Sequence, residues 1–299
     1  MRLTFLGTSA GEGYPAIWCD CPYCRYAREK AGKNLRYNSC AVLDGDVLLD
    51  MNANCFSAAQ RFGVDLLGVR HLFVTHDHQD HFFPQHLVWR SGPYTMGPGE
   101  DFEAPIEEVE PWLGQIGPRF SPLPELDIYG SASIAQAIDA HPRLSMENLS
   151  RIRARFTELS RGQVVQAGDM RVTAVTSHHG TPGMTYNYII ERGGKTLLYA
   201  LDTGGYDEDM LDILRAHRYD CVVLEGTFGH SPLDLDMHMS TRKDLSMLAF
   251  FTENGLWKGK PNMVLSHMAP HWTPPHDMYE PEMAAHGVTV AYDGLTVEV

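Results

Sequence analysis

Residues 71–83, HLFVTHDHQDHFF, hold four histidines and two aspartates directly after an apolar run. Residues 76–81 form the pattern His-x-His-x-Asp-His, and neutral imidazoles and carboxylates are good ligands for divalent metals. Two histidines two positions apart on an extended strand end can point the same way. If the chain then turns into a helix, the next Asp-His pair can point to a second position nearby. The stretch predicts a two-metal site with ligands His76, His78, Asp80 and His81.

A solvated histidine-rich loop is the alternative interpretation of this stretch. A lone His-x-His would usually be such a loop, but a six-residue pattern that follows a strand is more specific. In a two-metal site, the ions clamp a bridging hydroxide and orient it for attack. Asp80 could then both bind a metal and hold the proton of that hydroxide, so we assign it a catalytic role as well.

Composition and charge narrow the class of protein. The chain has 299 residues, of which 43% are hydrophobic and 21% charged, an ordinary globular composition. We expect a single domain over residues 1–299, because α/β layers can reach this size as one unit. No apolar run is long enough for a transmembrane helix, and residues 1–13 lack the pattern of a secretory signal, so we expect a cytoplasmic protein. A net charge of −14 disfavours a long nucleic acid as partner.

Five β-type runs each end in a histidine, aspartate or glutamate. These ends are His76, the pair His178 and His179, Asp202, Glu225 and His267. Charged side chains do not belong inside apolar strands, so we expect the ends to line one edge of a sheet and converge on a cleft.

Other segments predict an alternation of helices and hairpins, and hence layered α/β structure with mixed sheets. We expect helices within residues 22–32, 133–142, 145–159, 206–218 and 240–255, and hairpins within 40–51, 186–205 and 288–299. Residues 91–126 are rich in Pro and Gly and predict an insertion, which is either a lid over the cleft or else a surface excursion or oligomer contact.

Three cysteines, Cys19, Cys21 and Cys24, form a C-x-C-x2-C pattern. Three thiolates this close can bind one zinc ion, and a tetrahedral structural site needs a fourth ligand, which need not be local. A redox C-x2-C pair is the rival interpretation, but it leaves Cys19 unexplained.

The motif HDHQDH at residues 76–81 resembles the signature of the metallo-β-lactamase superfamily of hydrolases. The resemblance implies an α/β fold, an αββα four-layer sandwich of two mixed β-sheets flanked by helices, with a two-metal cleft at one edge. It also implies three later ligands, a histidine, a bridging aspartate and a last histidine. These match His179 (with His178 as competitor), Asp202 and His267.

The loop GTSAGEGYP and the cysteine pattern after it resemble the cyclic-phosphate phosphodiesterases of the carbon–phosphorus lyase pathway. That resemblance implies a structural zinc site completed by a histidine shortly after the last active-site histidine. His271 fits this position, and His276 is a reserve candidate.

Glu225, Thr227-Phe228 and His238-Met239-Ser240 resemble the E-x-T-F and H-x-S/T elements of the phosphodiesterases in the superfamily, which include transfer-RNA 3′-processing nucleases. The resemblance implies that His238 lies over the metals and that Glu225 orients it. A histidine in that place could protonate a leaving alkoxide as a general acid.

We therefore expect a metal-dependent phosphodiesterase that hydrolyses a small or cyclic phosphate ester through a hydroxide held by two metals. The expected cofactors are two divalent ions, Zn or Mn, in the active site and one structural Zn. The expected partner is a small-molecule phosphate ester. We expect no association with a membrane, and a homodimer is possible. Hydrolysis of a lactone, thioester or β-lactam at the same site is the alternative, and a non-catalytic metal-binding accessory protein is a third reading.

Overall fold

The computed structural model describes residues 1–91, 124–233 and 235–299. The predicted insertion at residues 91–126 lies almost wholly outside the described residues, and so does the lid that it was expected to form. Its two ends are described: Ser91 closes the short helix η2 (Trp89–Ser91), and Leu126 opens strand β5 (Leu126–Gly130).

Two seven-stranded mixed sheets form the centre of the molecule. The first sheet has the order β14-β1-β2-β3-β4-β5-β6, and the second has the order β13-β12-β11-β10-β9-β8-β7. The strands of the first sheet are β1 (Arg2–Gly7), β2 (Cys40–Leu43), β3 (Val47–Leu49), β4 (His71–Phe73), β5, β6 (Ala154–Glu158) and β14 (Thr296–Glu298). The strands of the second are β7 (Val164–Ala167), β8 (Met170–Thr176), β9 (Tyr186–Arg192), β10 (Lys195–Ala200), β11 (Cys221–Glu225), β12 (Met263–Ser266) and β13 (Val288–Val290).

Alternating side chains along the strands build the layers. On β10, Leu197 and Tyr199 face the core between the two sheets, whereas Leu198 and Ala200 face the helices outside. On β1, Leu3 and Phe5 likewise belong to the core between the sheets. Because both faces of each sheet are covered, the strands are apolar on both sides, as parallel segments of layered α/β proteins are.

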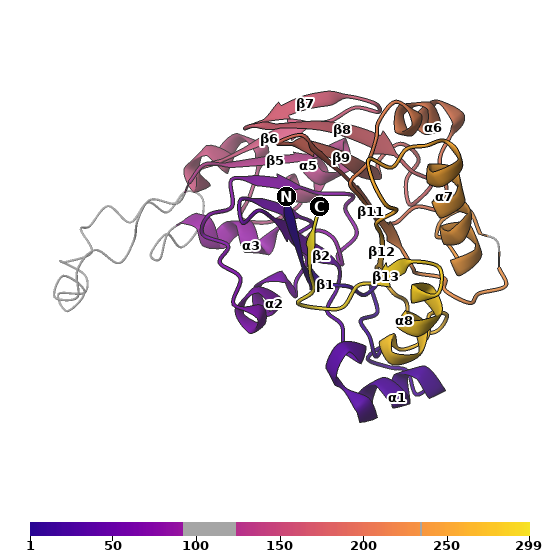
Figure 1. Ribbon diagram of the computed structural model, residues 1–299. Helices are drawn as coiled ribbons and strands as arrows, with labels where there is room; N and C mark the ends of the chain where they lie inside the picture. The colour runs from indigo at the N-terminus through magenta and orange to yellow at the C-terminus, as the bar shows by residue number, and fades with distance from the viewer. Residues whose placement is uncertain (92–123, 234) are drawn as a thin grey trace.

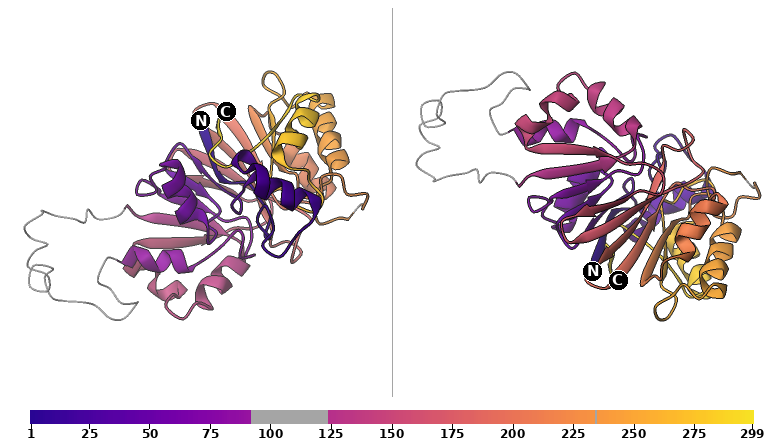
Figure 2. Two further views of the ribbon diagram at one scale, coloured as in Figure 1. Left: turned by 90° about the horizontal axis from the view of Figure 1, so that it is seen from below. Right: turned by 90° about the horizontal axis from the view of Figure 1, so that it is seen from above.

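Helices cover the outer face of each sheet (Figures 1 and 2). Helices α2 (Cys55–Phe62), α3 (Gln85–Val88) and α5 (Ala132–Asp139) pack on the first sheet. Helices α1 (Pro22–Lys30), α6 (Glu208–Arg215), α7 (Thr241–Glu253) and α8 (His276–Ala284) contribute to the apolar layer outside the second sheet. The predicted four-layer αββα sandwich is confirmed. Among the described helices, none has the length and apolar character needed to cross a bilayer.

Three sequence-based expectations about the strands and helices are wrong. Residues 288–299 are not a hairpin, because β13 pairs with β12 in the second sheet and β14 pairs with β1 in the first. The helix expected at residues 145–159 is a 3-10 helix, η4 (Met146–Ile152), followed by strand β6. The five strand ends do not belong to one sheet, because β4 lies in the first sheet and β8, β10, β11 and β12 lie in the second.

Candidate active site

The motif at residues 76–81 follows β4 and forms a tight turn instead of the expected helix start. The backbone N–H groups of His81 and Phe82 both donate to the carbonyl oxygen of His78. This turn reverses the chain within a few residues, so the two halves of the motif present their side chains to two neighbouring positions.

A first group of ligand atoms comes from His76, His78 and His179. Nε2 of His76 lies 2.8 Å from Nδ1 of His78, and Nε2 of His179 lies 3.3 Å from the same Nδ1 atom. The loop after β8 thus brings its histidine to the motif after β4, across the junction of the two sheets.

A second group of ligand atoms comes from Asp80, His81 and His267. Nε2 of His81 lies 3.1 Å from Nε2 of His267, and Oδ2 of Asp80 lies 3.4 Å and 3.5 Å from these two nitrogens. His267 directly follows β12, so this group also joins the two sheets.

Asp202, two residues after β10, lies between the two groups. Its Oδ2 atom is 2.7 Å from Nε2 of His81 and 3.2 Å from Nε2 of His267, and its Oδ1 atom is 3.6 Å from Nε2 of His179. One carboxylate therefore faces both groups, which is the position that a bridging ligand would take.

The donor set fits a pair of divalent cations. In each group, ring nitrogens of two histidines face each other at 2.8–3.1 Å. Two nitrogen lone pairs at this distance repel each other, and a cation between them would remove the repulsion. Oδ2 of Asp202 is buried and lacks a correctly aligned hydrogen bond. Burial lowers the pKa of His76 and of His179, which favours the neutral imidazole that a metal requires. Burial alone would also lower the pKa of His81, but the surrounding carboxylates, Asp202 foremost, raise it well above its usual value, so the position favours positive charge.

Neighbouring groups hold the ring nitrogens that point away from the cluster. Nδ1 of His81 lies 2.8 Å from Oδ2 of Asp50, and Nδ1 of His267 lies 2.9 Å from Oγ1 of Thr227. Nδ1 of His179 lies 3.0 Å from the carbonyl oxygen of Met237. Contacts of this kind fix the tautomer and the orientation of histidines that bind metals.

Asp50 was missed in the sequence, although the signal was present. It follows the apolar strand β3 as an aspartate at a strand end, like the five ends that were singled out. Asp50, Asp202 and His267 all adopt positive φ angles of 62°, 54° and 58°. Non-glycine residues rarely adopt this conformation, and such strain concentrates at functional sites.

The structure separates His178 from His179. Whereas His179 faces the cluster, Nε2 of His178 lies 2.9 Å from Oδ1 of Asp207 and points away from it. Burial lowers the pKa of His178, but the contacts with Asp207 and Asp236 outweigh it and raise the pKa above its usual value. This placement favours His179 as the ligand.

His238 and Glu225 lie together beside the cluster. Nδ1 of His238 is 2.7 Å from Oε2 of Glu225 and 3.6 Å from Oδ1 of Asp202. Glu225 is fully buried, and its other oxygen accepts a hydrogen bond from the backbone N–H of Thr203. Burial opposes the charged imidazole, but the Glu225 carboxylate outweighs it and raises the pKa of His238 to about 9.

A separate candidate metal site lies at the cysteine pattern. The ligand atoms of Cys19, Cys21 and His271 lie within 4.8 Å of one another, with Sγ of Cys19 3.5 Å from Nδ1 of His271. Burial opposes the thiolate of Cys21, but hydrogen bonds, first from the backbone of Cys24, lower the pKa of Cys21 to about 7. The pKa of Cys24 is raised to about 12 by burial and by the two neighbouring thiols. All three cysteines are free.

His276 does not join this cluster. It is the first residue of α8, and its Nδ1 lies 3.4 Å from Nη2 of Arg36, a buried cation. His271 is therefore the better placed of the two candidates for the fourth ligand.

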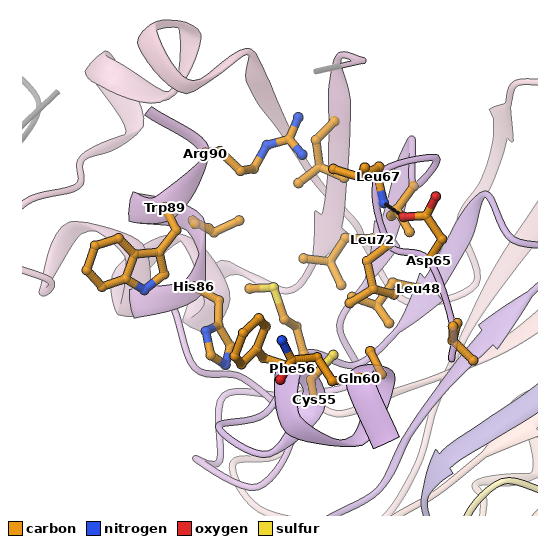
Figure 3. A pocket seen from close by; sticks show the side chains of 17 residues that line it. Leu48, Cys55, Phe56, Gln60, Asp65, Leu67, Leu72, His86, Trp89 and Arg90 are labelled. Carbon is orange, nitrogen blue, oxygen red and sulfur yellow. Dashed lines mark hydrogen bonds between the residues drawn. The ribbon is translucent and has the colours of Figure 1, made fainter. Parts of the chain in front are cut away.

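An apolar cavity of about 590 Å³ lies elsewhere, on the outer face of the first sheet between α2 and α3 (Figure 3). Phe56, Leu67 and Trp89 are among its lining residues, and all three are largely exposed. None of the residues that line it is a member of either candidate metal site.

Comparison with known proteins establishes the family. Residues 118–268, about half of the chain, match the model of the Beta-lactamase superfamily domain. A search of curated proteins gave no match. The chain belongs to the β-lactamase superfamily that this model describes. With the His/Asp cluster at the junction of its sheets, it is a metal-dependent hydrolase of the metallo-β-lactamase type.

Several solved structures share the fold over the full length of the chain. A diphosphatase from the PhnP family is 18% identical with a TM-score of 0.67, and the alignment covers 100% of this chain and 98% of that one. Zn(2+)-bound PqqB from Methylobacterium extorquens is 16% identical with a TM-score of 0.72, and both chains are covered to 100%. The short form of human tRNase Z is 19% identical with a TM-score of 0.63, and the coverage is 100% and 99%. At these identities the likeness shows the fold and assigns no branch of the superfamily.

Proposed function

We propose that this protein is a phosphodiesterase that hydrolyses a small or cyclic phosphate ester. The observation that carries the proposal is the His238–Glu225 pair, whose imidazole lies beside Asp202 and the two ligand groups. Hydrolysis of a phosphodiester expels an alkoxide, which is a poor leaving group and benefits from a general acid.

The residues that would hold the ions are His76, His78 and His179 at one position, and Asp80, His81 and His267 at the other, with Asp202 shared. Zinc and manganese both suit this ligand set. Such a pair of ions activates a water at neutral pH and neutralises the charge that develops on a phosphoryl group.

The chain's own groups supply the rest of the proposed chemistry. Asp50 and Thr227 hold His81 and His267 in fixed orientations. Glu225 holds Nδ1 of His238, which leaves Nε2 as the atom that gives a proton to the departing oxygen. The thiol cluster, proposed as a structural zinc site, ties the loop before α1 to the loop that follows β12.

The overall charge of −14 supports a small substrate over a long polyanion. Two proteins that share the fold are named a diphosphatase and a tRNase. Because that likeness shows the fold alone, the proposal rests on the His238–Glu225 pair.

Turnover measurements test the proposal. Protein loaded with zinc or manganese is assayed with bis(p-nitrophenyl) phosphate, a simple lactone and a thioester. We expect the phosphodiester to be hydrolysed with the highest kcat/KM. Preferential hydrolysis of the lactone or thioester would assign the site to acyl chemistry. Stoichiometric metal binding without turnover of any of the three would indicate an accessory protein.

A further inference from the structure

The short loop of residues 235–238, which carries His238, is held in an unusual way. Leu235 and Met237 are 42% and 46% exposed, and the side chain of Asp236 is 70% exposed. Residues 235–237 therefore have little side-chain burial to fix their place. His238 is only slightly exposed: its Nδ1 contacts Glu225, and its ring packs against the rings of His179 and Phe228 at centroid distances of 4.7 Å and 5.0 Å.

Backbone contacts with the loop after β10 hold residues 235–238 instead. A Cβ atom added to Gly204 would lie 2.2 Å from the backbone nitrogen of Met237 and 2.3 Å from the carbonyl carbon of Asp236. Real Cβ atoms do not approach other atoms this closely, so the two backbones can meet here only because residue 204 is glycine.

Lys243 joins the same two segments from the other side. Its Nζ atom, on the first turns of α7, donates to the carbonyl oxygens of Gly204 and Leu235 at 3.1 Å and 3.0 Å. One ammonium group thus binds both loops, on either side of the close approach at Gly204.

His178 adds a third connection. Its backbone N–H donates to Gly205, its carbonyl oxygen accepts from Gly204, and its Nε2 lies 2.9 Å from Asp207. Oδ2 of Asp236 lies 2.8 Å from Nδ1 of His178, although not in line for a hydrogen bond. Residues 235–238 are thus held against the segment 203–207, which follows β10.

We propose that Gly204 and Lys243 are positioning residues that fix the place of His238 beside the candidate metal cluster. This inference rests on the proposed function for its catalytic consequence, but the placement itself can be measured without activity. Moving residues 235–238 outward would take the imidazole away from Glu225 and from the leaving group. It would also loosen the contact between the carbonyl oxygen of Met237 and Nδ1 of His179, whereas no other ligand side chain in the described part of the chain is hydrogen-bonded to the backbone of this loop.

Two neighbouring glycines provide a matched pair of variants. Gly204→Ala forces the two backbones apart. In Gly205→Ala, the nearest atom to the added Cβ is the side-chain oxygen of Asp236 at 3.3 Å, which can rotate away. Lys243→Met is a second test that removes the ammonium bridge without adding bulk at the contact.

The first measurement is the rate at which diethyl pyrocarbonate modifies His238 in metal-saturated protein, determined by mass spectrometry. His230, which is 45% exposed, serves as the internal reference. We expect Gly204→Ala to raise the ratio of His238 to His230 modification several-fold, Lys243→Met to raise it less, and Gly205→Ala to leave it near the wild-type value. Equal ratios in wild type, Gly204→Ala and Lys243→Met would overturn the proposal.

The second measurement compares alkyl and p-nitrophenyl phosphodiesters. Gly204→Ala should lose activity selectively on the alkyl ester, and should cause no further selective loss when combined with His238→Ala. A loss of the same size in the presence and absence of His238 would contradict a positioning role. If wild-type protein hydrolyses neither ester, the proposed function fails, while the modification ratios still decide whether these residues position His238.

Discussion

Asp50 and His81 form a fully buried pair, in which Oδ2 of the aspartate lies 2.8 Å from Nδ1 of the histidine and neither side chain is exposed. Oδ1 of Asp50 also accepts hydrogen bonds from the backbone N–H and the hydroxyl group of Thr75, directly before the motif. One carboxylate at the end of β3 thus orients both a candidate ligand and the turn that presents the others.

The pair leads to a first prediction. Asp50→Ala should lower the affinity for one of the two active-site ions by about 10- to 100-fold, because orienting partners of metal-binding histidines contribute on that scale. Chelator competition with zinc measures the affinity. Asp127→Ala is the control, since Asp127 lies 3.8 Å from His71 at the opposite end of β4. Equal affinities in Asp50→Ala and wild type would remove the orienting role.

Asp80 provides a second prediction. Asp80→Ala should leave a folded protein with one ion bound more weakly and turnover reduced by orders of magnitude, because its carboxylate faces both His81 and His267. Asp77→Ala is the matched control within the same motif, because the exposed Asp77 instead accepts a hydrogen bond from Ser133. Metal content by mass spectrometry and kcat/KM are measured together. Unchanged turnover in Asp80→Ala would exclude the two-metal assignment.

The cysteine cluster provides a third prediction. Cys21→Ser should remove one equivalent of bound zinc and lower Tm, while the active-site ions remain, because structural zinc sites contribute directly to folding. Cys221→Ala, at a buried cysteine on β11, should keep the full zinc content. A disulfide between two of the three clustered cysteines in reduced protein would argue against the site.

His238 provides a fourth prediction. His238→Ala should slow hydrolysis of alkyl phosphodiesters about 10²-fold or more relative to p-nitrophenyl esters, whose leaving group needs no proton. Glu225→Gln should show the same pattern more weakly, because it misorients the imidazole without removing it. Equal losses on both kinds of ester would make His238 a substrate-binding or structural residue.

Asp244 provides a fifth prediction, on pH dependence. This residue on α7 is buried, and neither carboxylate oxygen has a hydrogen-bond partner. Burial, and then the negative charge of Glu225, raise the pKa of Asp244 well above its usual value. The protonated Asp244 therefore contributes to the free energy of unfolding in full below the pKa that this residue has in the unfolded chain. The contribution is lost as the pH rises from that value through the higher pKa of the folded state.

Asp244→Asn, which resembles the protonated acid, tests this expectation. Near pH 4 the free energy of unfolding of the variant should equal that of wild type. As the pH rises to 8, the variant should become more stable than wild type by about 1–3 kcal/mol, which is the cost of an uncompensated buried polar group. Denaturant unfolding at several pH values measures the difference. A difference that is constant with pH would show that Asp244 does not titrate in this range.

The sequence was sufficient for features that depend on local order. The motif at residues 76–81 predicted the four ligands His76, His78, Asp80 and His81, and the resemblance to the metallo-β-lactamase superfamily implied the three later ones. The structure brings these side chains together. The fold class followed from the motif and from the alternation of strands and helices. Asp50 follows an apolar strand as the other strand ends do, but its partner His81 could not be predicted, because the two lie 31 residues apart and only the pairing of β3 with β4 brings them together.

Features that depend on distant pairing could not be predicted in this way. Residues 145–159 have a helical pattern, but Arg153 adopts a φ angle of 54°, which ends η4, and the next five residues find their backbone partners on β5. Likewise, the Asp293-Gly294 turn signal is genuine, but the strands on either side of it join different sheets. The β-propensity of a segment does not determine which other strand it pairs with.

The pairing of Arg2–Thr4 with Thr296–Glu298 has a consequence for the biosynthesis of the protein. As the chain leaves the ribosome, one edge of β1 stays open until β14 has emerged, and exposed strand edges attract other chains. The nascent chain is therefore expected to depend on chaperones during this interval. His267 follows a strand of the second sheet and its partners Asp80 and His81 follow a strand of the first, so this ligand group comes together only after both strands have been translated and the sheets have met. We therefore expect the candidate site to reach its full metal content only after residue 267 has emerged.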